Sequence, residues 1–358
     1  MHLDRLHLVN FKNFEERTFD FSPKINAFVG NNGIGKTNVL DAIYYLSLFK
    51  SYFHHSDKHN IRFDQEFFFL EGWFYKNNKE EHVQCGVQVG QKKLVKRNQK
   101  PYDRISDHVG QFPVVIISPY DRDLIAEGSD IRRKFIDSII SQANVSYLKK
   151  LIRYNKVLQQ RNALLKYFAA NRTFDAIQLD IFDSEMLQLG EYIFKEREKF
   201  IQEFHPVFQS YYYEISTGKE KVSIKYASNL KENREDYLTI NLDKDKLLQY
   251  TSAGVHKDDL VLQINHHHIK KYGSQGQQKS FLIALRLAQL EFIKNHLNIT
   301  PILLLDDIFD KLDESRVEQL IKLVNNAQFG QIFISDTHPE RTEQILKKVN
   351  EDFTLFKL

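Results

Sequence analysis

Cysteine is almost absent from this sequence of 358 residues, which holds a single one, Cys85. One thiol cannot form an internal disulfide bond, so nothing in the sequence indicates a secreted, disulfide-bonded fold. The N-terminus lacks a basic segment followed by an apolar one, which argues against a signal peptide. No stretch approaches the ~20 apolar residues of a membrane-spanning helix, so we expect no membrane insertion; peripheral attachment is left open.

Neither sign of charge dominates the composition. The chain has 50 Lys and Arg residues against 47 Asp and Glu residues, a formal net charge of +3. This small basic excess is compatible with nucleic-acid contact but is no evidence for it. A hydrophobic share of 42%, with 28 Phe and 17 Tyr residues, predicts a globular chain. Its length predicts two domains, or one large domain that carries an insertion.

Proline and glycine are scarce between residues 131 and 212, where only Pro206 and Gly190 occur. Apolar residues recur there at intervals of seven in two series, which are Leu151, Leu158 and Leu165, then Leu187, Phe194, Ile201 and Phe208. This spacing predicts long helices packed side by side, with a break at 170–173. We therefore expect an α/β domain interrupted by an antiparallel helical arm. The expected parts are 1–125 for the first half, 126–245 for the arm and 246–358 for the second half.

A glycine-rich segment follows a strand-like run at 25–29. Residues 30–37, Gly-Asn-Asn-Gly-Ile-Gly-Lys-Thr, match G-x-x-x-x-G-K-[ST] at every fixed position, and a helix-like stretch follows. The glycines let successive N–H groups face a phosphate at the positive end of that helix. We expect Lys36 to reach the β- and γ-phosphates of ATP and the Thr37 hydroxyl to bind Mg²⁺. The full expected cradle is Gly30, Asn31, Asn32, Gly33, Ile34, Gly35, Lys36 and Thr37.

A second motif supplies carboxylates for the metal. Four apolar residues at 302–305 end in Asp306 and Asp307. A buried parallel strand would carry both carboxylates to its C-terminal edge, beside the phosphate loop. We expect Asp306 to hold Mg²⁺ through water, and Asp307 to orient or deprotonate the attacking water. The two motifs together predict an ATPase that uses Mg²⁺.

Two basic stretches are candidate DNA contacts. Lysines and Arg97 between residues 92 and 100 surround a predicted hairpin turn, where they either bind DNA phosphates or form a solvated face. Arg132 and Arg133 begin the predicted arm. Positive charge is unfavourable at a helix start, so this pair predicts either contact with DNA or an internal carboxylate partner.

Residues 273–279, Gly-Ser-Gln-Gly-Gln-Gln-Lys, precede a helix-like stretch and resemble the signature motif of the ABC ATPase superfamily. Residues 311–313 resemble its D-loop, and His338, after a strand-like run, resembles its switch histidine. The resemblance implies that the signature completes the nucleotide site of a second subunit, so that ATP holds a head-to-tail homodimer together. The residues implied in that role are Ser274, Gly276 and Gln277. Lys36, Asp307 and His338 are the implied catalytic residues.

Further stretches make the chain similar to one family of chromosome-maintenance ATPases, the bacterial RecF family of DNA replication and repair proteins. They are 10–14, 38–43, 118–124, 128–129, 132–137, 254–260 and 274–278. The resemblance runs from residue 1 to about 345. It implies an ABC-type P-loop ATPase head, similar to that of SMC proteins, with a helical arm inserted. It also implies that Lys12 and Asn13 lie near the nucleotide.

The resemblance implies a cytoplasmic, ATP-dependent DNA-binding protein with slow, DNA-stimulated ATP hydrolysis. It would act with RecR and RecO to place RecA on gapped DNA, and would support replication restart and the SOS response. Two departures are Lys257, where many relatives have Arg, and His338, near which several relatives have Thr or Asp. The alternatives are a nucleotide-binding subunit of an ABC transporter, another SMC-like ATPase, or a DNA scaffold that binds ATP without turnover.

Overall fold

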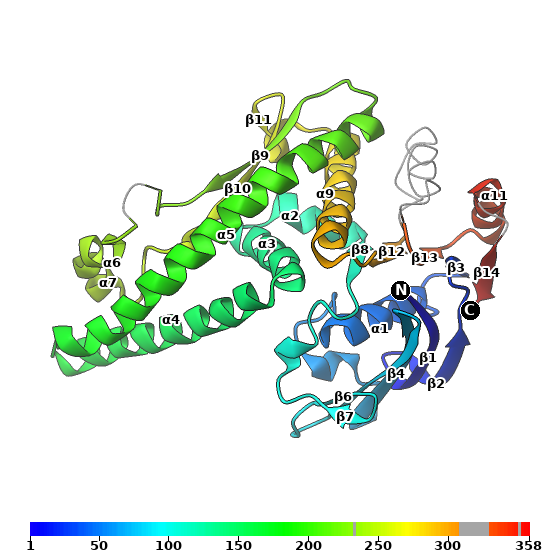
Figure 1. Cartoon of the computed structure of the whole chain (residues 1–358), viewed down its shortest axis with the longest axis horizontal. Coiled ribbons are helices and arrows are strands. Elements are labelled where there is room, and N and C mark those ends of the chain that lie inside the picture. The colour runs from blue at the N-terminus through cyan, green and yellow to red at the C-terminus, as the bar shows by residue number, and fades with distance from the viewer. Residues whose placement is uncertain (232–233, 308–328, 350–351) are drawn as a thin grey trace. The chain divides into compact units, whose positions relative to one another are not determined.

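The chain divides into two compact units in the computed structural model, which describes residues 1–231, 234–307, 329–349 and 352–358 (Figure 1). Unit 1 comprises Met1–Arg122, Ser210–Lys219 and Gln275–Leu358, and unit 2 comprises Asp123–Gln209 and Glu220–Ser274. The expected boundary at 245/246 differs from this division, because β10 (Asp259–Ile264) pairs with β9 (Val222–Ala227) inside unit 2. The expected D-loop at 311–313 and the helix-like stretch at 314–325 lie outside the described residues.

A five-stranded parallel sheet forms one layer of unit 1. Its strands, in the order in which they lie side by side, are β14 (Phe353–Lys357), β3 (Ile25–Val29), β13 (Ile332–Asp336), β12 (Ile302–Asp306) and β8 (Val114–Ile117). Every residue of the inner three strands is buried, as in parallel sheets covered on both faces. The strands predicted at 25–29 and 302–305, and the strand-like run before His338, are thus confirmed.

An antiparallel sheet forms a second layer of unit 1. Its strands, again in spatial order, are β2 (Phe14–Asp20), β1 (His2–Phe11), β4 (Phe67–Lys76), β5 (Lys79–Gln88), β6 (Leu94–Arg97) and β7 (Lys100–Pro101). Aromatic side chains join the two layers: the ring of Phe19 packs edge-on to Phe28 at 5.6 Å, and Phe21 to Phe333 at 4.8 Å. Helix α1 (Lys36–Leu48) contributes to the same core. Cys85 of β5 also lies in it, fully buried.

Two long antiparallel helices dominate unit 2. Figure 1 shows α4 (Val145–Asn171) and α5 (Ala176–Ser216) side by side, joined by a short turn. Ion pairs from Arg153 to Glu185 and from Arg161 to Asp183 link them across the pair. The predicted break at 170–173 is confirmed within two residues. Helix α3 (Ser129–Ala143) precedes α4, and Asn144 separates the two by capping the N-terminus of α4.

The buried face of these helices differs from the expected one. The buried seven-residue series are Tyr147, Tyr154, Arg161 and Phe168 in α4, and Leu179, Met186, Ile193 and Phe200 in α5. Leu151 and Leu158 are only partly buried, so the series expected for α4 is wrong. The reason is that α4 buries tyrosines and an arginine whose polar atoms are hydrogen-bonded inside unit 2. A pattern of apolar residues alone does not reveal such positions. In α5, Phe194 and Phe208 of the expected series are buried as well, whereas Leu187 and Ile201 are only partly buried.

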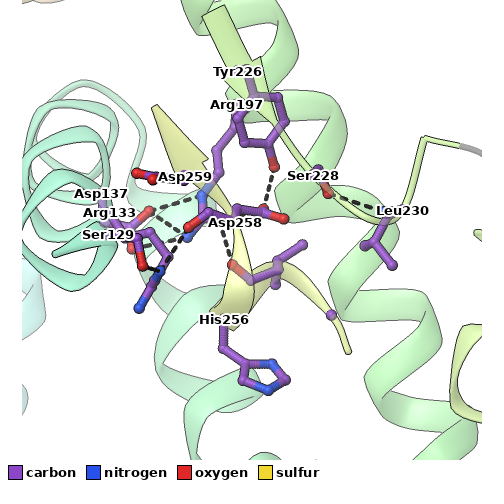
Figure 2. A network of polar contacts seen from close by, with 12 residues as sticks. Ser129, Arg133, Asp137, Arg197, Tyr226, Ser228, Leu230, His256, Asp258 and Asp259 are labelled. Atoms are coloured by element: carbon purple, nitrogen blue, oxygen red, sulfur yellow. Dashed lines mark hydrogen bonds and ion pairs between the residues drawn. The ribbon is translucent and has the colours of Figure 1, made fainter. Parts of the chain in front are cut away.

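A polar network centred on Arg197 of α5 joins the parts of unit 2 (Figure 2). The guanidinium, 2% exposed, donates to Asp258 at 2.8 Å and to Asp137 of α3 at 2.9 and 3.0 Å. The hydroxyl of Tyr226 on β9 also donates to Asp258. The network ties a helix of the arm to the sheet of β9, β10 and β11 (His267–His268). Unit 2 is completed by the short helices α2 (Asp123–Ala126), α6 (Tyr237–Ile240), α7 (Leu242–Leu248) and α8 (Ile269–Tyr272).

Candidate nucleotide-binding site

The phosphate loop and the acidic motif meet at one edge of the parallel sheet. In the strand register, Asp306 of β12 lies beside Ser335 of β13, and Ser335 lies beside Phe28 of β3. The carboxyl ends of the three strands are therefore level, and the loop at 30–37 leaves β3 at the same edge that carries Asp306. This is the edge at which open parallel sheets bind ligands.

The loop has the backbone that a phosphate cradle needs. Its three glycines, Gly30, Gly33 and Gly35, all have positive φ, at 146°, 83° and 114°. At Gly35 a Cβ would lie 2.7 Å from both Asn13 and Phe14, so only glycine fits the turn into α1. The ammonium group of Lys36 is folded over the loop and donates to the carbonyl oxygens of Gly30 at 2.7 Å and Asn31 at 2.8 Å. The loop thus combines a glycine-dependent backbone with one buried cation.

Asp306 accepts hydrogen bonds from three hydroxyl groups. Thr37 of α1 donates to Oδ1 at 2.8 Å, Ser335 of β13 donates to Oδ1 at 2.8 Å, and Ser118 donates to Oδ2 at 3.4 Å. Burial raises the pKa of Asp306 above its ordinary value, and the three hydroxyl donors counteract that rise. Thr37 and Asp306, both expected to bind Mg²⁺, are thus in direct contact.

The oxygen atoms around Asp306 fit a magnesium ion. A hydroxyl and a carboxylate are hard oxygen ligands, which Mg²⁺ prefers. No group of three His, Cys, Asp or Glu side chains able to hold a metal occurs in the part of the chain that the structure describes. Mg²⁺ is usually bound by one or two carboxylates together with the phosphates of a substrate.

Asn13 contacts the loop and Lys12 contacts the helix that follows it, and their expected place near the nucleotide stays a prediction. The amide nitrogen of Asn13 donates to the carbonyl oxygen of Ile34 at 2.8 Å, and its amide oxygen accepts from Asn38 at 2.7 Å. The ammonium group of Lys12 forms a 2.5 Å ion pair with Asp41 of α1, whose side chain is fully buried. Asn13 thus braces the loop itself, while Lys12 is anchored to the helix behind it.

The two remaining catalytic candidates follow the ends of β12 and β13. Asp307 has a positive φ of 48°, and its N–H donates to the Ser335 hydroxyl at 3.0 Å. His338 is exposed and stands just before α11 (Pro339–Val349), where its carbonyl oxygen accepts from Thr342 at 2.9 Å. Both are therefore on loops at the edge that carries Asp306. Their roles in catalysis stay predictions.

The signature-like residues straddle the boundary between the units. Ser274 is exposed and ends unit 2, whereas Gly276 and Gln277 lie in the first turn of α9 (Gln275–Leu297), which belongs to unit 1. From Ser280 to Leu290 every residue of α9 is buried. The first turn is therefore the accessible end of a buried helix. The role of these three residues toward a second subunit also stays a prediction.

Several basic side chains of the two stretches form ion pairs with carboxylates of the same chain. Arg132 donates to both carboxylate oxygens of Asp259, at 2.6 and 3.0 Å. Arg133 donates to the Asp258 carbonyl oxygen at 2.7 Å (Figure 2). Of the two alternatives, the internal partner is thus confirmed for Arg132. In the hairpin stretch, Arg97 pairs with Glu81 and Lys93 with Asp57, which leaves Lys92 and Lys100 exposed.

Ser118 and Ser335 are residues of the site to which the sequence analysis assigned no role. Ser118 directly follows β8, and Ser335 lies within β13. Both strands are adjacent to β12, so the parallel register brings each hydroxyl to Asp306. The only signal in the sequence was a small polar residue at the end of an apolar run. The same signal marks many loops, and it becomes informative only when the strand order is known.

Comparison with known proteins decides the family. A model of the RecF/RecN/SMC N terminal domain matches residues 2–99. A protein of Flavobacterium johnsoniae named DNA replication and repair protein RecF is 55% identical over 361 residues, covering 100% of both chains. The chain belongs to the RecF family of DNA replication and repair proteins. A RecF of Phocaeicola vulgatus is 49% identical over 99% of this chain and 96% of its own length.

Solved structures agree with the RecF assignment. The structure described as the recombination mediator protein RecF-ATP in the RecFOR pathway is 30% identical, has a TM-score of 0.88, and covers 94% of this chain and 92% of its own. An Smc head domain from Pyrococcus furiosus, 16% identical with a TM-score of 0.56, shares the fold. The ABC-type ATPase head expected from the sequence is thus confirmed. Among the described residues, no helix has the length and apolar character needed to cross a membrane.

Proposed function

We propose that the site at the edge of the parallel sheet binds ATP with Mg²⁺ and hydrolyses it slowly. The observation that carries the proposal is the 2.8 Å hydrogen bond between Thr37 and Asp306, because it joins the phosphate loop to the acidic strand with two ligands suited to Mg²⁺. A bound Mg²⁺ would neutralise charge that develops on the phosphates during transfer. The RecF-ATP complex of a relative supports the same ligand.

Each side chain of the site has a proposed role that follows from its position. Lys36, now donating to two loop carbonyls, would turn its ammonium group to the β- and γ-phosphates. The loop N–H groups and the start of α1 would hold the phosphate oxygens. Ser335 and Ser118 donate to the Asp306 carboxylate and orient it toward the phosphate loop. Asp307 would orient the attacking water, and His338 would contact the γ-phosphate.

ATP would also join two copies of the chain. In this proposal Ser274, Gly276 and Gln277 of one subunit complete the site of the other, and the homodimer binds DNA without reading its sequence. The partly exposed first turn of α9 supports this role, since anions commonly bind at the start of a helix. The 55% identity to a RecF protein over the full length of both chains favours this proposal over a transporter subunit.

By the same relationship we propose a cytoplasmic protein that acts with RecR and RecO to load RecA on gapped DNA and supports the SOS response.

Fluorescence anisotropy tests the proposal directly. The chain would be titrated onto a gapped duplex, a single strand and a blunt duplex, each with and without ATP and Mg²⁺, beside light scattering to follow the dimer. We expect ATP to increase the dimer fraction and to tighten DNA binding. Lys36→Ala should lose both gains, whereas Lys24→Ala, which removes an exposed lysine before β3, should keep them.

The outcomes separate the parts of the proposal. A Lys36→Ala protein with an unchanged ATP-dependent dimer would overturn the clamp. Absence of DNA binding under every nucleotide condition at low salt would overturn direct DNA contact. ATP binding would then be judged separately, from the Kd for a fluorescent ATP analogue. Phosphate release measured on the wild type separates an ATPase from a scaffold that only binds ATP.

A further inference from the structure

Asp121 and Arg286 form a buried ion pair between two elements of unit 1. Asp121 lies just after β8 and is 2% exposed, and Arg286 lies in the middle of α9 and is 8% exposed. The guanidinium donates to Asp121 Oδ1 at 2.5 Å. It also donates to the hydroxyl of Tyr52 at 2.9 Å and to Gln289 at 2.8 Å. The pair thus fastens the loop after β8 to the helix that begins with the signature residues.

One residue connects this pair to the nucleotide site. The second oxygen of the Asp121 carboxylate accepts from the N–H of Ser118 at 3.1 Å, and the hydroxyl of Ser118 donates to Asp306 at 3.4 Å. A continuous series of polar contacts therefore runs from Asp306 through Ser118 and Asp121 to Arg286. All four residues belong to unit 1.

A second branch reaches α1, the helix that follows the phosphate loop. The hydroxyl of Tyr52 donates to Asp121, and the N–H of Tyr52 donates to Asp41 at 2.8 Å. Asp41 is the buried partner of Lys12, on the helix that follows the loop. Asp121 is thus the point where contacts from Asp306, from α1 and from α9 converge.

Stability alone gives no account of this arrangement. A buried ion pair contributes little net stability, because both charges must lose their water, and apolar side chains of similar size often serve as well. What a charged, hydrogen-bonded network does provide is a fixed geometry among its members. The Arg286 fork meets three acceptors at once, which sets the position of α9 relative to the loop after β8.

We propose that Asp121 and Arg286 are positioning residues that couple the Asp306 carboxylate to the first turn of α9. A change at Asp306 when ATP and Mg²⁺ bind would shift Ser118 and Asp121 and, through Arg286, the end of α9 that carries Gly276 and Gln277. The inference deepens the proposed function and rests on it, since it says how the nucleotide site and the signature residues of the same subunit act together.

The test compares Asp121→Asn, Arg286→Gln, Arg286→Lys and the double variant Asp121→Asn/Arg286→Gln with the wild type. Asp121→Asn preserves the shape of the side chain and removes its charge. Three quantities are measured on the intact chain: the Kd for a fluorescent ATP analogue, the turnover number, and hydrogen–deuterium exchange of the segment 275–285 with and without ATP and Mg²⁺. Arg161→Gln serves as a control, because it breaks a buried ion pair of unit 2 outside the nucleotide site.

We expect the Kd to change by less than about 3-fold and the turnover number to fall by ~10- to 100-fold, since misplacing a group by about 1 Å can cost 10²-fold. ATP should alter exchange at 275–285 in the wild type and in the Arg161→Gln control, but not in Arg286→Gln. Arg286→Lys, which keeps the charge, should recover part of both effects. The double variant should be no worse than the worse single one, because both break the same connection.

Several results would overturn the coupling. Unchanged turnover and an unchanged exchange response in Arg286→Gln would do so, as would equal effects in Arg161→Gln, which would mean that lost stability is the cause. If the wild type binds ATP and shows the exchange response but no turnover, the ATPase proposal fails and the coupling is judged by exchange alone. If the wild type does not bind ATP, both fall.

Discussion

Arg161 of α4 and Asp245 of α7 lie 84 residues apart in the sequence and form a 2.7 Å ion pair with neither side chain exposed. Arg161 also donates to Asp183 of α5 at 2.6 Å. One guanidinium therefore holds three helices of unit 2 together. It does so at a position in α4 where a helical pair would ordinarily carry an apolar residue.

Breaking that pair should destabilise the chain. Arg161→Gln leaves the Asp245 carboxylate buried without its cation, and we expect the free energy of unfolding to fall by ~3–5 kcal/mol. Urea unfolding followed by circular dichroism measures it. Lys195→Ala is the matched control, since Lys195 pairs with Glu191 at the surface of α5, where the loss of an exposed ion pair changes stability little. Equal midpoints for the two variants would contradict the prediction.

The hydroxyl of Thr37 should set the affinity for Mg²⁺. Thr37→Ala removes the group that donates to Asp306, and we expect the Mg²⁺ concentration for half-maximal ATP turnover to rise by ~10- to 100-fold. Thr37→Ser keeps the hydroxyl and should stay within about 3-fold of the wild type. A titration of turnover against Mg²⁺ at saturating ATP distinguishes them. A Thr37→Ala protein with the wild-type Mg²⁺ dependence would remove Thr37 from the metal site.

Gly35 should tolerate no side chain. In Gly35→Ala the Cβ would clash with Asn13 and Phe14 at 2.7 Å in a backbone with φ of 114°, so the loop must open and ATP binding should weaken by at least ~100-fold. Gly90→Ala is the control: its φ is 77°, but nothing lies within 4 Å of the added Cβ. It should lose ~1 kcal/mol of stability and retain ATP affinity. Calorimetric titration with ATP analogues checks both.

His108 should make the chain sensitive to acid. Its imidazole is fully buried between the Leu46 carbonyl oxygen at 2.8 Å and the Tyr102 hydroxyl at 2.9 Å. Burial lowers its pKa from 6.5 to about 3, so the unfolded chain binds the proton first as the pH falls. The stability from neutral His108 is complete above pH 6.5 and is lost progressively toward pH 3. At pH 5 the loss is about 2 kcal/mol.

The measurement for His108 is a comparison of slopes. Unfolding free energies of the wild type and of His108→Gln would be determined at several values between pH 7.5 and 5. The variant is less stable throughout, because it loses packing against Phe49, but its stability should fall less steeply as the pH decreases. Parallel curves would show that His108 titrates alike in the folded and unfolded chain.

Local sequence predicted the site wherever its parts are contiguous. The loop at 30–37 and the strand ending in Asp306 were both found, because each motif is short and its spacing follows from the chemistry of phosphate and Mg²⁺. Ser118 and Asp306 are 188 residues apart, and Asp121 and Arg286 are 165 apart. No periodicity within a segment connects such pairs. They become visible only once the order of β12, β13 and β8 is known.

The helical arm shows a different limit of prediction from sequence. The seven-residue spacing, together with the scarcity of glycine and proline, was enough to predict its helices and the break between them, because helix formation is largely a local property. The buried face could not be predicted in this way, since Tyr147, Tyr154 and Arg161 bury polar atoms whose partners come from other helices and loops. Hydrophobic spacing identifies a face only when that face is apolar.

The burial of Cys85 has a practical consequence for those who study this protein. Its thiol lies inside the core of unit 1, and burial raises its pKa to about 12, so the reactive thiolate is scarcely formed at neutral pH. The natural chain therefore behaves toward maleimide dyes as though it had no cysteine. A cysteine introduced at one exposed position, such as Lys24→Cys, can carry a fluorophore without altering the native core, which opens the ATP cycle to single-molecule observation.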